Sequence, residues 1–214
     1  MDVICTGELL FSKKKQSVIL TLIVVFVLLA VLIFFYFFAF IPIKGESMEN
    51  TIRDKQYCFV QRKCNTFCRG DIVIVDVAGE KEETHDIIKR IIGLGGDQLI
   101  FMRGGNGTII ETYIRKNGSN KFTKVDEPYI KEPMKYAAAN FYNVPIMQHD
   151  DSLTTNDLNN LDPQTYAKID PFITYVPDGH VFFLGDNRNV SRDSRYYGTR
   201  PLDKVKYKVL SVMY

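Results

Sequence analysis

One run in this sequence of 214 residues constrains its fold more than any other: from Ser17 to Ile43 there is no charged residue. Nearly every position in the run is Val, Ile, Leu or Phe. As a helix, about 27 residues would reach roughly 40 Å, enough to cross a bilayer with some tilt. The apolar region of a cleavable signal peptide is only about 7–15 residues long, and no Ala-x-Ala-like site follows before Ser47. We therefore predict a transmembrane helix over residues 17–43.

The charges on either side of this segment predict its orientation. Three lysines at positions 13–15 directly precede it, whereas Lys44 is soon followed by two glutamates. By the positive-inside rule, residues 1–16 form a cytoplasmic N-terminus and residues 44–214 lie outside the cell membrane. No second apolar run of comparable length occurs, so we expect a single-pass protein in contact with membrane lipid.

Charge and cysteine content exclude several classes of protein. The chain has 27 Lys and Arg against 25 Asp and Glu, and this balance lacks the basic patch of a nucleic-acid-binding protein. Cys58, Cys64 and Cys68 would lie outside the membrane, with a spacing that is not a zinc signature. A Cys64–Cys68 disulfide and free thiols both remain open. The three histidines are widely scattered, so we predict no metal site and no cofactor.

Beyond the apolar run, the sequence indicates β-structure, because short apolar segments are separated by Gly, Pro and Asp without helical periodicity. The predicted strands are 57–61, 71–77, 87–92, 181–184 and 206–213, with a turn at Gly95-Gly96. We predict a mainly β fold with an antiparallel β core formed by residues 44–97 and 177–214. Residues 98–176 contain a turn cluster and a long polar stretch, which we interpret as an inserted smaller β-containing domain.

Two residues beyond the apolar run could together cleave an acyl bond. Ser47 follows the membrane segment closely, but a serine hydroxyl is a poor nucleophile unless a neighbouring base takes its proton. Lys89 lies in an apolar strand whose alternation sends Lys89 and Arg90 to opposite faces. A lysine desolvated by apolar neighbours has a lowered pKa and can act as a general base, which arginine cannot. A turn serine and a solvated lysine at a strand edge are the alternative interpretations.

A third polar segment, GDNRNVSRDSRYYG at 185–198, follows the apolar strand at 181–184. A lysine base needs a group that orients its amine, and Ser191 could supply a hydroxyl. In an extended segment Ser191, Asp193 and Arg195 share one face, so an Asp193–Arg195 ion pair would brace the segment. Ser-Lys dyads are a known variant of the serine-histidine-acid arrangement. A polar hairpin turn would explain the first residues of this segment but not the whole run.

These motifs resemble those of type I signal peptidases, membrane-bound serine proteases that remove signal peptides from exported proteins. The resemblance covers the N-terminal anchor and four blocks in the family's order, GESMENT (45–51), RGDIVIVDV (69–77), IIKRIIGLGGD (87–97) and GDNRNVSRDSRYYG (185–198). Between the third and fourth blocks it extends only to Asp126-Glu127-Pro128-Tyr129.

The resemblance implies roles for single residues. Ser47 would be the nucleophile, its backbone N–H an oxyanion donor, and Lys89 the general base. The lysine amine would be positioned and supported by Gly185, Ser191, Asp193 and Arg195. The implied substrates are preproteins with Ala-x-Ala-like cleavage sites, paired as an added strand with the backbone near 42–45 and 86–88. The substrate-binding residues would be Ile43, Gly45, Met48 and Ile88.

The sequence also departs from the family pattern. Asn50, Gly95, Asn189 and Val190 stand where the family usually has Pro, Pro, Asp and Asn. Some members have a serine in place of Gly45 that adds a second oxyanion donor. Because no catalytic group is lost, the resemblance implies an active enzyme.

Three other functions are compatible with parts of the sequence. The alternative is a related membrane-anchored Ser-Lys protease, or an assembly factor, dedicated to a narrow client set such as pilus subunits. Penicillin-binding enzymes also use serine and lysine, but the S-x-x-K match from Ser12 to Lys15 is cytoplasmic and K-T-G is absent. A tethered binding module without chemistry would not need the dyad.

Overall fold

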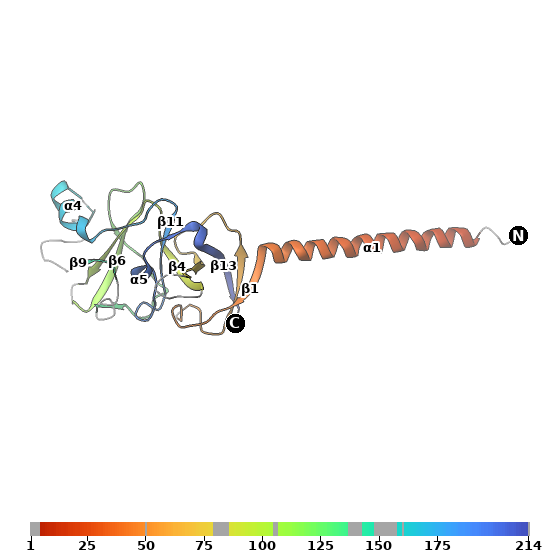
Figure 1. Ribbon diagram of the computed structural model, residues 1–214, viewed down its shortest axis with the longest axis horizontal. Coiled ribbons are helices and arrows are strands. Elements are labelled where there is room, and N and C mark those ends of the chain that lie inside the picture. The colour runs from red at the N-terminus through yellow and green to blue at the C-terminus, as the bar shows by residue number, and fades with distance from the viewer. Residues whose placement is uncertain are drawn as a thin grey trace. The chain divides into compact units, whose positions relative to one another are not determined.

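The computed structural model describes residues 5–49, 51–78, 86–104, 107–136, 143–147, 158–159 and 161–213, with side chains from residue 15 onward. The chain forms two units, Met1–Ala39 and Phe40–Tyr214. Helix α1 (Cys5–Phe37) makes up most of the first unit, and the second contains the sheets and the shorter helices (Figure 1).

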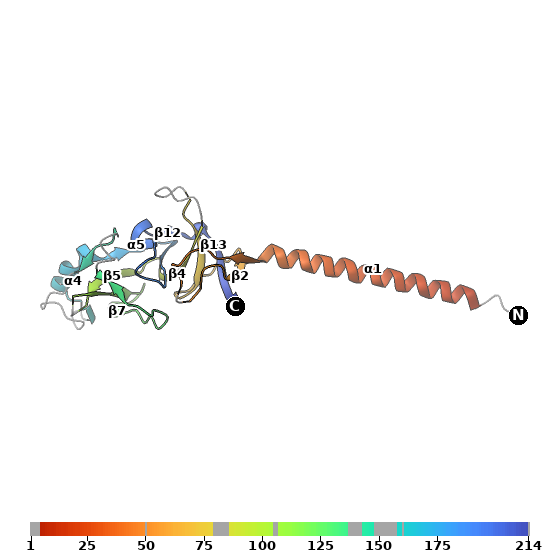
Figure 2. The same ribbon diagram turned by 90° about the horizontal axis from the view of Figure 1, so that it is seen from below.

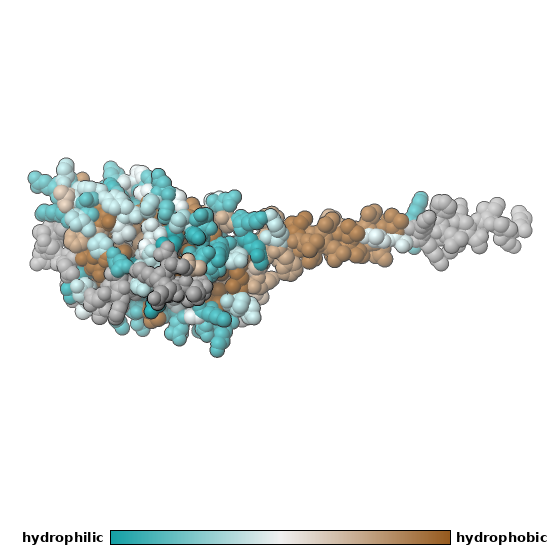
Figure 3. All heavy atoms as spheres, viewed as in Figure 1, coloured by the Kyte–Doolittle hydropathy of each residue, from teal (hydrophilic) through white to brown (hydrophobic). Residues whose placement is uncertain are grey.

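Helix α1 contains most of the predicted membrane segment. Its stretch Lys15–Phe37 is long and apolar enough to cross a membrane, since its 23 residues rise about 35 Å. Figure 3 shows apolar side chains along the visible face of this stretch. As a helix, the predicted segment 17–43 extends too far, because Phe38–Pro42 form strand β1. Apolar and aromatic residues suit both elements, so the composition did not mark the boundary, although Pro42 cannot continue a helix.

The first sheet has the strand order β1-β2-β13-β3-β4-β11-β12, and its neighbours from β2 to β12 pair antiparallel. The last strand in the sequence, β13, therefore lies between β2 and β3. The strands predicted for this part of the chain are confirmed within two residues at their ends. Their bounds are β2 (Tyr57–Arg62), β3 (Ile72–Asp76), β4 (Asp86–Leu94), β11 (His180–Leu184), β12 (Arg200–Pro201) and β13 (Val205–Met213).

The second sheet comes from the segment predicted as an insertion. Its order is β10-β5-β6-β7, with β8 also paired to β6 and β9 parallel to β5. Helix α4 (Pro163–Ile169) begins after Asp162, whose side chain accepts hydrogen bonds from the N–H groups of Gln164 and Thr165. The strands are β5 (Gln98–Arg103), β6 (Ile109–Arg115), β7 (Thr123–Lys124), β8 (Met134–Lys135), β9 (Ile146–Met147) and β10 (Thr174–Tyr175).

Strand β11 of the first sheet packs against the second sheet. In Figure 2, β4 lies between β2 of the first sheet and β5 of the second sheet. Phe182 and Leu184 join a cluster with Leu99 and Phe101 of β5, whereas Phe183 packs on the opposite face of β11. Burial on both faces explains why this strand is a continuous apolar run without polar alternation. Because Phe40–Tyr214 is one compact unit, the second sheet packs onto the first, and its standing as a separate domain stays a prediction.

The polar segment 185–198 begins where β11 ends. It contains the short helix α5 (Ser194–Tyr197). The 3-10 helices among the described residues are η1 (Asp170–Phe172) and η2 (Leu202–Lys204). Phe183 N donates to Ser194 Oγ at 2.9 Å, which folds the segment back onto the strand that precedes it. The buried strand thus holds a dense polar segment at its end.

Candidate active site

Ser47 lies in a turn that follows β1. Hydrogen bonds of 2.8 Å join the N–H and C=O groups of Ile43 to the backbone at 55–56. Gly45 has φ of +95°, a left-handed conformation that favours glycine, and its N–H donates to Asp54 Oδ1 at 2.8 Å. The turn that presents Ser47 is therefore fixed on its N-terminal side.

Lys89 reaches Ser47 from the middle of β4. Its Nζ lies 2.7 Å from Ser47 Oγ and 2.8 Å from the carbonyl oxygen of Ile88. Lys89 is 2% exposed, so its amine is buried beside the serine hydroxyl. A general base must lie within about 2.6–3.2 Å of the group whose proton it takes, and this pair meets that criterion.

Gly185 packs directly against both Ser191 and the turn that carries Ser47. A Cβ atom added to Gly185 would lie 2.1 Å from Ser191 Oγ and 2.5 Å from the carbonyl oxygen of Ser47. The same carbonyl accepts a hydrogen bond of 3.0 Å from Asn187 N. The structure therefore brings the start of the 185–198 segment against Ser47, and only glycine fits at position 185.

Asp193 and Arg195 form a buried ion pair of 2.7 Å between Oδ2 and a guanidinium nitrogen. The Asp193 carboxylate also accepts from Gly185 N at 3.0 Å. Burial alone would raise the pKa of Asp193, but the charge and N–H groups of Arg195 and the Gly185 N–H together hold that pKa below its usual range. The pair thus connects the body of the 185–198 segment to the glycine at its start.

We expect Asp193→Asn to destabilise the chain at neutral pH, because it leaves Arg195 buried without its counter-charge, at a cost of about 3–5 kcal/mol. The pKa of Asp193 is lower in the folded chain than the value of about 3.9 for an unfolded Asp. Its stabilisation is therefore present above that pH and is lost as the pH falls through the folded pKa. In thermal unfolding of the detergent-solubilised chain, the difference in Tm between wild type and variant should narrow below about pH 4.

The exposed Asp203 provides the control for this prediction, since Asp203→Asn should leave Tm unchanged. An Asp193→Asn variant with the same Tm difference at neutral and acidic pH would contradict it.

Two adjoining cavities lie beside Ser47 and Lys89. The first, of about 320 Å³, is lined by both residues together with Lys44, Gly45, Glu46, Asp86, Ile87, Ile88, Arg192 and Tyr197. The second, of about 590 Å³, is lined by Ile41, Pro42, Ile43, Lys44, Gly45, Ile74, Asp86, Ile88 and Tyr207. Together they follow the end of β1 and the start of β4, and their lining includes Ile43, Gly45 and Ile88.

Met48, the fourth predicted substrate-binding residue, does not line the two cavities that together contain Ile43, Gly45 and Ile88. It is 1% exposed, and its sulfur accepts a hydrogen bond of 3.4 Å from Asp186 N. Within this turn the Met48 side chain packs into the interior and contacts the 185–198 segment, and its role in substrate binding stays a prediction.

The sequence analysis assigned no role to a second network around Asp186. Arg90 makes two bonds to this carboxylate, of 2.9 Å from Nε and 2.6 Å from a terminal nitrogen. Thr51 Oγ1 also donates to Asp186. The alternation of β4 could have revealed this network, because it directs Arg90 away from Lys89 and toward the opposite face.

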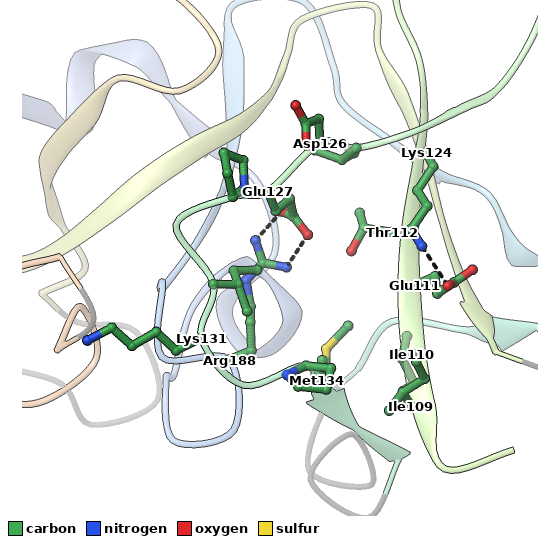
Figure 4. A pocket seen from close by; sticks show the side chains of 14 residues that line it. Ile109, Ile110, Glu111, Thr112, Lys124, Asp126, Glu127, Lys131, Met134 and Arg188 are labelled. Carbon is green, nitrogen blue, oxygen red and sulfur yellow. Dashed lines mark hydrogen bonds and ion pairs between the residues drawn. The ribbon is translucent and has the colours of Figure 1, made fainter. Parts of the chain in front are cut away.

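Arg188 lies on the wall of a further cavity, of about 470 Å³, between the second sheet and the loop that follows β7 (Figure 4). Two of its guanidinium nitrogens bond the carboxylate of Glu127, and its Nε donates to Gly185 O at 3.0 Å. Glu127 belongs to the family-like stretch at 126–129, to which the sequence analysis attached no chemistry.

Two further departures from the family pattern, Asn189 and Val190, lie away from Ser47 and Lys89. The Asn189 side chain bonds the backbone of Pro133 and Lys135, and Val190 is 60% exposed. Asn50 lies outside the described residues. Among the described residues, neither Asn189 nor Val190 hydrogen-bonds Ser47 or Lys89 or lines the cavity beside them.

The cysteines outside helix α1 are free thiols, so the structure favours the second of the two open alternatives. Cys58 is buried, which raises the pKa of its thiol to about 11, whereas Cys64 is partly and Cys68 fully exposed. Within the part of the chain that the structure describes, no group of three or more His, Cys, Asp or Glu side chains is arranged to hold a metal ion.

Comparison with known proteins places this geometry in context. Residues 16–214 match the family described as signal peptidase, peptidase S26. Signal peptidase IB of Staphylococcus aureus (strain N315) is 29% identical over 170 residues, which cover 78% of this chain and 73% of that protein. Signal peptidase I of Bacillus licheniformis is 33% identical over 163 residues, 74% of this chain and 67% of that protein. The crystal structure of a signal peptidase I from Enterococcus faecalis V583 covers 70% of this chain and 100% of its own, with a TM-score of 0.39 and 20% identity.

Proposed function

Because this chain belongs to the signal peptidase family, peptidase S26, we propose that it cleaves exported preproteins with Ser47 as nucleophile and Lys89 as general base. Membership of the family confirms the resemblance seen in the sequence and makes the chain a serine peptidase of signal peptides. The residues that act, the cleavage site and the side of the membrane are the proposal. The observation that carries it is the 2.7 Å contact between Lys89 Nζ and Ser47 Oγ on the wall of a cavity.

In the first step Lys89, as a neutral amine, takes the proton of Ser47 while Oγ attacks the carbonyl carbon of the scissile bond. Burial favours the neutral amine because desolvation penalises an ammonium ion. The bond from Oγ to carbon creates a tetrahedral oxyanion, for which the backbone N–H of Ser47 is a suitable donor. Gly45 has no hydroxyl that could add a second donor.

In the second step the C–N bond breaks, and Lys89 gives its proton to the leaving amine, which becomes the N-terminus of the mature protein. The signal peptide is now esterified to Ser47. Water, losing a proton to Lys89, attacks this ester, releases the signal peptide with a free carboxylate and restores Ser47. Throughout, Gly185 and Ser191 position the amine, and the Asp193–Arg195 pair supports them.

The cavities beside the dyad suit a short extended peptide. Their lining combines backbone at 42–45 and 86–88 with the apolar side chains Ile43, Ile74 and Ile88. An extended substrate can pair with such backbone as an added strand, while side chains of alternate residues enter the apolar pockets. The proposed substrate therefore has small residues, commonly Ala-x-Ala, before the cut.

Helix α1 supplies the proposed location. Lysines precede its apolar stretch Lys15–Phe37, so the positive-inside rule keeps the N-terminus in the cytoplasm. The rest of the chain then lies at the outer face of the cytoplasmic membrane, where cleavage sites of exported preproteins emerge.

The experiment that tests this function offers the detergent-solubilised chain a preprotein with an Ala-x-Ala site. We expect cleavage after the second Ala, and replacement of that Ala by Leu should slow cleavage at least about tenfold, because the larger side chain does not fit a pocket shaped for a methyl group. Mass spectrometry of the products gives the position of the cut.

Replacement of the middle residue of the same site by Leu is the matched control and should have little effect. A chelator should not change the rate. Equal cleavage of the Ala and Leu substrates, or cleavage elsewhere in the preprotein, would overturn the proposed substrate class.

A further inference from the structure

Residues 126–129 lie in the loop that follows β7. This stretch contacts Arg188 and Arg90, which hydrogen-bond Gly185 and Asp186 at the start of the 185–198 segment. We infer that Glu127 and Tyr129 are positioning residues of the peptidase: they hold Arg188 and Arg90 in place, and thereby hold Gly185 and Asp186 against Ser47. The inference rests on the proposed roles of Ser47 and Lys89, and it assigns a function to a loop outside the first sheet.

Glu127 fixes the plane of the Arg188 guanidinium. Its Oε2 accepts a bond of 3.0 Å from one terminal nitrogen of Arg188, and its Oε1 accepts a bond from the other. A third N–H, on Nε, donates to Gly185 O at 3.0 Å. The Arg188 side chain is 1% exposed. A buried guanidinium held on one edge by a carboxylate can direct its third N–H in only one direction, and that direction is the carbonyl of Gly185.

Tyr129 holds the Arg90 guanidinium in place through its aromatic ring. The centre of the Arg90 guanidinium lies 4.0 Å from the centroid of the Tyr129 ring, within the range of a cation–π contact. The edge of the same guanidinium holds Asp186 through two hydrogen bonds. Tyr129 OH also donates to Glu127 Oε1 at 3.1 Å, so the two loop residues support each other.

The geometry around Gly185 explains why this support matters for the reaction. Gly185 leaves no space for a Cβ atom between Ser191 Oγ and the carbonyl oxygen of Ser47. A shift of its backbone would therefore move the turn that carries the nucleophile, the hydroxyl proposed to orient Lys89, or both. Lateral displacement of reacting groups by about 1 Å can lower a rate about 100-fold.

The cavity beside Glu127 makes a discriminating experiment possible. Figure 4 shows Glu127 and Arg188 on one wall and the Lys124–Glu111 ion pair on the other. Exposed Lys131 also lines the cavity, so it opens to solvent. Thr112 Oγ1, which also lines the cavity, is buried and has no hydrogen-bond partner among the described residues. A small carboxylate from solution therefore has an entrance, a hydroxyl donor and a place beside Arg188 once the Glu127 side chain is removed.

In the full chain we expect Glu127→Ala to lower kcat for an Ala-x-Ala preprotein about 10- to 100-fold, with KM within about twofold of wild type. Acetate or formate should restore part of the lost kcat in a concentration-dependent way, whereas chloride at the same ionic strength should not. Tyr129→Leu should lower kcat more than Tyr129→Phe, because only phenylalanine keeps the ring that faces Arg90.

Glu111→Ala is the matched control, because Glu111 is a carboxylate of the same cavity that pairs with exposed Lys124 and has no bond to the 185–198 segment. It should leave kcat unchanged with or without acetate. All rates are normalised to the folded fraction measured by circular dichroism. If Glu127→Ala does not fold, the isosteric Glu127→Gln replaces it in the comparison of kcat.

Normalised kcat values within twofold of wild type for the foldable Glu127 variant would overturn the inference. So would a loss that acetate does not reduce in Glu127→Ala, since that points to a structural role alone. Failure of the proposed function is distinguishable, because then the wild-type chain itself would leave the preprotein uncut or Ser47→Ala would still cut it.

Discussion

Replacing Lys89 with methionine is expected to lower kcat by about 10⁴-fold or more, because among the described residues its amine is the side-chain group that hydrogen-bonds Ser47 Oγ. Methionine has nearly the length of lysine without the amine and suits a buried position, so the fold should persist. Lys89→Arg should not restore activity, because a guanidinium remains protonated at any working pH. Cleavage of the Ala-x-Ala preprotein by both variants, followed by gel or mass spectrometry, measures the effect.

The exposed Lys204 provides the control for these two variants, and Lys204→Met should cleave at the wild-type rate. A folded Lys89→Met enzyme that retains a tenth of the wild-type kcat would show that another group acts as base. Ser47→Ala should be as inactive as Lys89→Met, and the double variant no worse, because the two residues act as a unit.

The second large effect is expected for Gly185→Ala. The added methyl group would lie 2.1 Å from Ser191 Oγ, 2.4 Å from Ser191 Cβ and 2.5 Å from the carbonyl oxygen of Ser47. The serine side chain could rotate away, but the carbonyl belongs to the backbone of the turn that carries Ser47 and must move with it. We expect kcat to fall by about 100-fold or more, with a smaller change in KM, in the same preprotein assay.

Gly118→Ala separates this effect from general destabilisation. Gly118 has φ of +82° and open space around its added Cβ, so alanine strains the backbone by about 1 kcal/mol without a clash. This variant should unfold at a lower temperature and yet keep the wild-type kcat. If Gly185→Ala also keeps its kcat, the contact between the 185–198 segment and Ser47 has no catalytic importance.

The strands could be predicted from sequence because they rest on local patterns, whereas the pairing of Ser47 with Lys89, which are 42 residues apart, was implied by the resemblance to a family. Short apolar runs bounded by turn residues predicted the strands, and the alternation of β4 directed Lys89 and Arg90 to opposite faces. The end of α1 was missed because the aromatic residues of β1 continue the apolar run without a break. Local composition holds no signal there except Pro42.

The contacts of Glu127 and Tyr129 could not be predicted from sequence for a different reason. Each partner lies far away in the chain, Arg188 being 61 residues from Glu127. The pairs exist because the second sheet packs onto β11, and an isolated sequence offers no rule for which buried arginine meets which carboxylate. Met48 shows the same limit, because its contact with Asp186 of the 185–198 segment depends on packing and not on its closeness to Ser47 in sequence.

The position of β13 implies that the peptidase can become active only after its C-terminal strand has been synthesised. In the first sheet β13 separates β1 and β2, which lead into and out of the Ser47 turn, from β3 and β4, which carry Lys89. A growing chain that lacks Val205–Met213 therefore has both halves of its dyad but not the strand that joins their sheet. The order of synthesis would therefore delay the proposed protease activity until this last strand has been made.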